Sequence, residues 1–269
     1  MTWLWEKLTA PEFARAVEAA GGVCVVPLGV IEKHGEHLPL GTDMFVAREV
    51  AERAAVIEPA VIFPPYYLTQ INEARHVPGT LAIRTELMLE LLDNLCDEIA
   101  RNGLHKILLL NGHGGNECWL SLFAMHMLER RRPFTLYIAR LHDYHGAVAD
   151  DPAWKAQMVS AIDAHGGEME TSAVLAVCPD LVRMDAVAGA GGGMGRLAQL
   201  PVLTPSWWYA EAPQHYYGDA THATAEKGEF LLQRYSQRVA DIIKAVKADT
   251  KARELEDEFF ARVSELAGV

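Results

Sequence analysis

Four residues within twelve positions could together bind a divalent metal ion. Glu32, His34, His37 and Asp43 lie in the run Pro27-Leu28-Gly29 to Asp43. Glu32 and His34 are two positions apart, so in extended backbone their side chains point the same way, whereas on a helix they would diverge. Asp43 could be a helix N-cap or a metal ligand. Singly, such residues are more often hydrogen-bonded or solvated, but together they favour a metal site.

A second polar run, Asn111-Gly112-His113-Gly114-Gly115-Asn116, offers another imidazole. Its glycines allow a sharp turn and let His113 approach a ligand closely. A phosphate-binding loop is the obvious competitor. It is disfavoured because the run lacks the GxGxxG spacing and a Gly-Lys-Ser/Thr ending.

A third run contains one imidazole and two carboxylates, at His165, Glu168 and Glu170. If the following helix begins near Thr171, both carboxylates share a face. If the helix begins earlier, they point apart and only one can reach a common site. Either could instead interact with the helix N-terminus.

These runs need a fold that brings them together, and the hydrophobic pattern predicts one. Strands are expected at 23–27, 61–63, 106–110 and 135–139, and helices at 10–20, 43–55, 85–100, 117–131, 172–177 and 223–248. This alternation predicts an α/β fold of three layers with a mostly parallel central sheet, in one domain over residues 1–269. The first two polar runs follow strands, where parallel sheets tend to bind ligands.

The composition excludes some functions. A formal net charge of -12 opposes binding to nucleic acid or anionic lipid. With no signal-like N-terminus and no long uncharged segment, we expect a protein that is neither exported nor membrane-bound. The four cysteines form no CxxC pair and are expected to be buried thiols in a reducing compartment, hence a cytoplasmic location.

Together these motifs resemble the creatininase family of amidohydrolases, from Val26 to about Gly228. The resemblance rests on the E-x-H-G-x-H-L-P-L-x-T-D run at Glu32 to Asp43, Pro78-Gly79-Thr80, N-G-H-G-G-N, the His165 to Ser172 segment, Gly218-Asp219 and Ala223 to Gly228. One such run would be moderate evidence. The combination, in this order, is highly specific.

The resemblance implies a site and a mechanism. Residues matching Glu32, His34, Asp43 and His113 are metal ligands in that family, with the aspartate bridging two ions. Carboxylates and imidazoles without thiolates suit two divalent ions per chain, Zn²⁺ and/or Mn²⁺, with Fe²⁺ possible. A bridging water is the expected nucleophile. His165 matches the family's catalytic histidine and is expected to shuttle the proton.

The sequence departs from creatininase proper at Gly115, where that enzyme has a further glutamate ligand. Another anion is therefore expected, and Glu170 is the first candidate, with Glu168, also a candidate catalytic residue, and Glu117 behind it. The same departure disfavours creatinine itself as the substrate. Cyclic amides, formamides, peptides and keto-inositols remain open, as does a noncatalytic small-molecule binding protein that kept the fold.

Other polar and aromatic residues are candidates for contacts with a small-molecule substrate. His37 and His76 could contact substrate or orient a ligand. Trp207 and Trp208 could form a wall of the pocket or pack in the core or between subunits. The family resemblance further implies a homo-oligomer, a hexamer.

Overall fold

The computed structural model describes residues 2–141 and 151–267. Its central sheet has four parallel strands in the order β2-β1-β3-β4. The strands are β1 (Val23–Leu28), β2 (Val61–Ile62), β3 (Lys106–Asn111) and β4 (Thr135–Arg140). Each lies within one residue of its predicted bounds, because buried runs of apolar residues mark such strands clearly.

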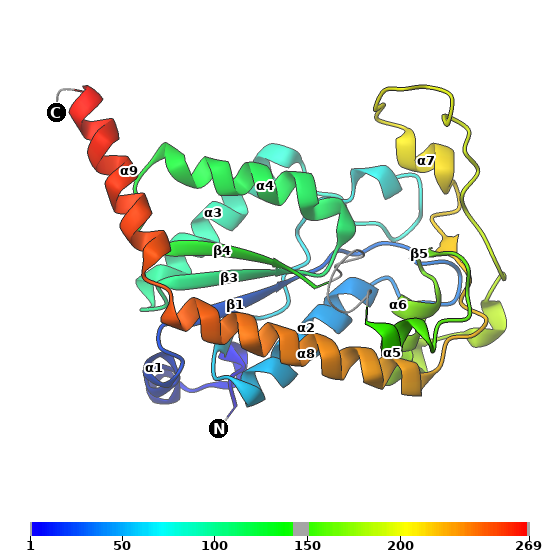
Figure 1. The fold of residues 1–269 in the computed structure, drawn as a ribbon, viewed down its shortest axis with the longest axis horizontal. Helices are drawn as coiled ribbons and strands as arrows, with labels where there is room; N and C mark the ends of the chain where they lie inside the picture. The colour runs from blue at the N-terminus through cyan, green and yellow to red at the C-terminus, as the bar shows by residue number, and fades with distance from the viewer. Residues whose placement is uncertain (1, 142–150, 268–269) are drawn as a thin grey trace.

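Helices cover both faces of the sheet (Figure 1). One face packs on α1 (Ala10–Ala19), α3 (Thr85–Arg101) and α4 (Glu117–His126), and the other on α2 (Thr42–Ile57), α6 (Glu168–Val177) and α8 (Ala225–Ala248). Alternate β1 residues enter the two cores, Cys24 with the first group of helices and Val25 with the second. The three-layer α/β fold with a parallel sheet is therefore confirmed.

Several further elements lie outside these layers. They are α5 (Pro152–Lys155), α7 (Trp207–Glu211), α9 (Lys251–Ala267) and a two-stranded antiparallel sheet of β5 (Asp163–His165) and β6 (Tyr217–Gly218). Strands of two or three residues show no readable period, so the sequence did not predict this small sheet. In Figure 1, α9 projects from one corner of the molecule.

Two expectations need correction. Helix α6 begins at Glu168, four residues before the predicted start at 172. Cys118 is exposed on α4 and Cys178 is half-buried, so only Cys24 and Cys96 are the buried thiols expected of all four. None of the helices among residues 2–141 and 151–267 combines the length and apolar character needed to cross a bilayer.

Helices α6 and α8 cross so closely that one contact point has no room for a side chain. A Cβ added to Gly228 in α8 would lie 1.8 Å from the backbone oxygen of Ser172 in α6. A backbone atom cannot move aside as the end of a flexible side chain can. The two helices would have to separate.

We therefore expect Gly228→Ala to lower the free energy of unfolding by about 3 kcal/mol or more, at the upper end for overpacked cores. Denaturant unfolding of the metal-free protein would measure the loss. Gln237→Ala, at an exposed position of the same helix, is the control and should change stability by less than about 0.5 kcal/mol. An equally mild effect of Gly228→Ala would contradict the close helix packing.

Candidate metal centre

The candidate ligands meet at the carboxyl ends of β1 and β3, which are neighbours in the sheet. Glu32 and His34 lie in the loop after β1, His113 follows β3, Asp43 is in the first turn of α2, and Glu170 is in the first turn of α6. The approach of α2 depends on Gly29, because a Cβ there would lie 2.6 Å from the Met44 backbone nitrogen. The sheet edge and two helix N-termini thus enclose one site.

Asp43 lies between two histidines. Its Oδ1 is 3.0 Å from Nε2 of His34, and its Oδ2 is 2.9 Å from Nδ1 of His113. Glu32 Oε1 is also 2.9 Å from His113 Nδ1, and Glu170 Oε2 is 3.9 Å from His34 Nε2. The side chains therefore form two groups with metal-ligand spacing, each with one histidine and two carboxylates, and Asp43 belongs to both.

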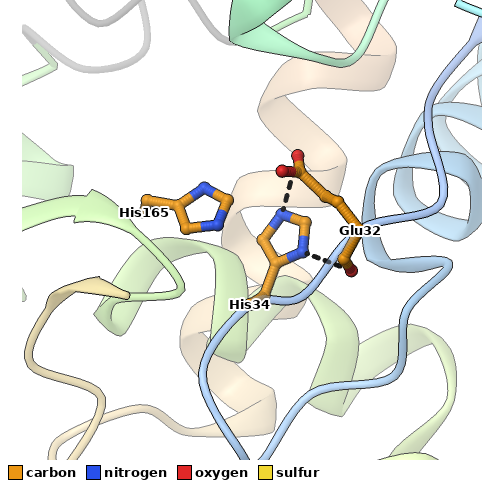
Figure 2. A group of neighbouring side chains, drawn as sticks. All are labelled: Glu32, His34 and His165. Carbon is orange, nitrogen blue, oxygen red and sulfur yellow. Dashed lines mark hydrogen bonds and ion pairs between the residues drawn. The ribbon is translucent and has the colours of Figure 1, made fainter. Parts of the chain in front are cut away.

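A third group with metal-ligand spacing joins Glu32, His34 and His165 (Figure 2). The rings of His34 and His165 stack with centroids 4.2 Å apart. Nε2 of His34 is 3.8 Å from Oε1 of Glu32, while its Nδ1 faces the Glu32 carbonyl oxygen at 3.4 Å. Nε2 of His34 therefore faces carboxylates on both sides.

The burial of these groups fits a bound metal. Glu32, His34 and Asp43 are at most 3% exposed. Among the described residues, Oε1 of Glu32, Nε2 of His34 and Oδ2 of Asp43 are buried; they contact other groups of the cluster but form no hydrogen bond of good geometry. Buried polar atoms rarely remain unsatisfied. Oxygen and imidazole nitrogen donors are those that Zn²⁺ and Mn²⁺ accept, so this donor set fits such an ion.

The close carboxylates also change the protonation of the histidines. Burial alone would lower the pKa of His34, but the Asp43 and Glu32 carboxylates outweigh burial and raise the pKa to about 10. The pKa of His113 is raised well above its usual value: burial opposes this rise, and Glu32 and Asp43 outweigh burial. Without metal, we therefore expect both rings to be protonated on both nitrogens, and positively charged, at neutral pH.

Metal binding should consequently release protons. An imidazole must be neutral to ligate, so we expect about one proton per ligating histidine, two per chain, to leave at pH 7. The apparent metal affinity should rise about tenfold per pH unit for each proton while the pH stays below the raised pKa values. Calorimetric titration with Zn²⁺ in two buffers of different ionisation enthalpy would count these protons. Binding without proton release between pH 6 and pH 8 would contradict this account.

His165 is arranged as a proton carrier. Its Nε2–H donates to the carbonyl oxygen of Lys33 at 2.9 Å, which leaves Nδ1 as the unprotonated nitrogen. Burial, followed by the charge of His34, lowers the pKa of His165. The ring is therefore neutral at pH 7, with a lone pair on Nδ1 ready to accept a proton.

His215 lines the same pocket as the candidate ligands, and the sequence did not predict its contact with Glu32. The indole N–H of Trp208 donates to Nδ1 of His215 at 2.9 Å, so Nε2 carries the ring hydrogen and donates it to Oε2 of Glu32. This contact leaves Oε1 of Glu32 to face His113. His215 also has a φ of 53°, rare for any residue but glycine, and the sequence gives no sign of this conformation.

The early start of α6 separates the two candidate glutamates. Glu170 faces His34, whereas the Glu168 carboxylate pairs with Lys227 and accepts from the backbone nitrogens of Val159 and Ser160 at 3.0 and 2.7 Å. Glu168, predicted as a catalytic residue, thus anchors a loop instead of facing the pocket. Glu117, the other candidate fifth ligand, pairs with Arg140 at 3.2 Å, away from the candidate ligands.

Of the four residues predicted to contact the substrate, two line the pocket and two do not. Trp207 and Trp208 of α7 line a pocket of about 210 Å³ that also contains the candidate ligands and His165. His37 is buried and its Nε2 forms a hydrogen bond with the Thr171 hydroxyl at 2.8 Å. His76 is exposed and its Nε2 donates to the carbonyl of Pro213 at 3.0 Å. Among the described residues, neither histidine lines this pocket.

Together, the fold and the site define an α/β protein with a buried cluster of metal-ligand type. Residues 6–243 match the creatininase family model, described as creatinine amidohydrolase. The chain belongs to the creatininase family and is a hydrolase of that family, as its motifs predicted.

Relatives and solved structures agree with this assignment. The chain is 32% identical to a mycofactocin precursor peptide peptidase of Mycolicibacterium smegmatis (88% of this chain, 90% of the relative) and 28% identical to a creatinine amidohydrolase of Pseudomonas putida (88% and 95%). It is 27% identical to a 3-dehydro-scyllo-inosose hydrolase of Thermotoga maritima (83% and 78%). Creatininase structures in a manganese form (TM-score 0.78) and, for a variant, a zinc–zinc form (0.77) are each 25% identical and cover 93% of this chain and 100% of the other. These forms support divalent metal binding here.

Proposed function

We propose that the chain holds two divalent ions, Zn²⁺ or Mn²⁺, and hydrolyses a small cyclic amide or a related carbonyl compound. The observation that carries this proposal is the position of Asp43, whose two oxygens face two different histidines at 3.0 and 2.9 Å. A carboxylate shared in this way suits a pair of ions. His34 and Glu170 would complete one position, and Glu32 and His113 the other.

When bound, such ions lower the pKa of a water molecule and polarise a carbonyl oxygen. The chain itself supplies the group that transfers the proton and the residues that hold the metal ligands in place. Nδ1 of His165 accepts the proton of the attacking water and returns it to the leaving atom, while Trp208 and His215 hold Glu32 in place. Trp207 and Trp208 form an apolar wall that excludes water from one side of the pocket.

The size of the pocket limits the part of the substrate that reaches the metal. A cavity of about 210 Å³ accepts a small ring or a single amide group. This size supports a compact carbonyl compound, or the end of a longer molecule, as the reacting part. Homo-oligomer formation and a cytoplasmic location stay predictions.

A second candidate function is the hydrolytic ring opening of a keto-inositol. The observation that favours it is the pair of tryptophans at the pocket, since the apolar faces of polyol rings stack on indole. The reaction would need the same ions and the same proton carrier. Only the substrate differs.

A substrate panel would test the proposal and separate the candidates. Protein reconstituted with Zn²⁺ or Mn²⁺ would be assayed against lactams, formamides, keto-inositols and short peptides, with the metal-free protein as control. We expect metal-dependent turnover of at least one amide. Turnover of keto-inositols alone would favour the second candidate, and turnover of none of them by fully loaded protein would refute both.

A further inference from the structure

One ring nitrogen of the metal site still needs a partner. Nδ1 of His113 faces Glu32 and Asp43, whereas its Nε2 is buried and has no hydrogen-bond partner among residues 2–141 and 151–267. A histidine that binds a metal through one nitrogen almost always donates the other N–H to a carboxylate, carbonyl or water. Glu170 is not placed to be this partner, because it lies at the other end of the site, with His34.

A carboxylate stands next to this nitrogen, across the place where Gly115 has no side chain. A Cβ added to Gly115 would lie 2.5 Å from Nε2 of His113 and 2.9 Å from Oε1 of Glu73. The two groups therefore border the same small space, which is open because residue 115 is glycine. Glu73 also lines the metal pocket.

The chain holds Glu73 at this position. Gln70 Nε2 donates to both carboxylate oxygens of Glu73, at 3.2 and 2.9 Å. The backbone nitrogen of Gln70 in turn donates to Oδ1 of Asn116 at 3.1 Å, which ties this segment to the loop that carries His113. The Gln70 amide is neutral, so its hydrogen bonds do not cancel the charge of the Glu73 carboxylate.

Glu73 is not placed as a metal ligand. None of the three groups with metal-ligand spacing includes it. We propose instead that Glu73 is a positioning residue: it accepts the Nε2 hydrogen of His113 through one water in the space at Gly115. This contact fixes the tautomer in which Nδ1 binds the ion. The inference rests on the proposed metal site.

A chelator competition with Zn²⁺ tests this role without measuring catalysis. We expect Glu73→Gln to weaken one of the two binding steps about 10- to 100-fold, the range for partners that orient a ligand, and to leave the other step unchanged. Glu73→Asp keeps the charge and should recover part of the loss. Glu117→Gln is the matched control: this carboxylate flanks the same loop but pairs with Arg140, and both steps should stay within twofold of wild type.

A double-mutant cycle with Gly115→Ala provides a sharper test. The added methyl group would occupy the space between Glu73 and His113, so this variant should weaken the same single step. Because both changes break one contact, Glu73→Gln should cause no further loss in the Gly115→Ala background. Fully additive losses would overturn the inference.

A merely structural role for Glu73 has a different signature. If Glu73 only supported the fold, Glu73→Gln would weaken both steps and lower the melting temperature of the metal-free protein. Either that result or two unchanged steps would overturn the inference. Failure of the wild-type chain to bind two zinc ions would instead refute the proposed function.

Discussion

Asp43→Ala is expected to reduce hydrolysis at least about 10³-fold and to leave the chain unable to retain two metal ions. The Asp43 carboxylate belongs to two of the three groups with metal-ligand spacing, the two proposed to hold the ions, so its loss removes a ligand from each position at once. Charge stabilisation by metal ions contributes several kcal/mol to such reactions, and each 1.36 kcal/mol is a factor of ten in rate.

The measurement is metal content by elemental analysis after dialysis, with kcat for the substrate identified by the panel. Asp241→Ala, at an exposed aspartate of α8, is the control and should keep both ions and full activity. Asp43→Ala protein that still retains two ions and wild-type activity would refute the assignment of the metal site.

His165→Asn is expected to lower kcat by about 10²- to 10⁴-fold, the range for general acid–base catalysis, and to leave the metal content unchanged. The reason is the fixed tautomer of His165, whose Nε2 is occupied by the Lys33 carbonyl while Nδ1 is unprotonated. Loss of metal together with activity would show that His165 is a ligand, as its grouping with Glu32 and His34 would also allow.

The pH dependence of kcat tests the same role of His165. The pKa of His165 is lowered, so the ring becomes protonated, and useless as a base, only below its ordinary value of 6.5. In the wild-type enzyme kcat should therefore fall as the pH drops through that lowered pKa, and His165→Asn should abolish this acid limb. His222→Asn, at an exposed histidine, should keep both the rate and the limb.

The sequence was most informative where a site residue follows a strongly patterned element. Buried strands precede Glu32 and His113, and adjacent parallel strands end at the same edge, so their convergence was predictable. From the sequence alone, the choice between Glu168 and Glu170 depended on where α6 begins. That start depends on contacts such as the Lys227 pair with Glu168, which local sequence does not encode.

His215 and Glu73 could not be predicted from the sequence, for different physical reasons. His215 reaches Glu32 from a backbone conformation that favours glycine, and only tertiary contacts can impose it. Glu73 lies in a three-residue 3₁₀ helix, Asn72–Ala74, with no periodic pattern to place it beside Gly115. Gly115 itself showed that one carboxylate ligand was missing, for which Glu170 was the first candidate, but it did not indicate that a further carboxylate, Glu73, would lie beside it.

Anomalous diffraction from crystals of the zinc-loaded protein would show whether Asp43 stands between two ions. We expect two anomalous peaks about 3.5–4 Å apart. Oδ1 of Asp43 should contact the ion beside His34 and Glu170, and Oδ2 the ion beside His113 and Glu32. A single peak at full zinc saturation, or two peaks without Asp43 between them, would contradict this arrangement.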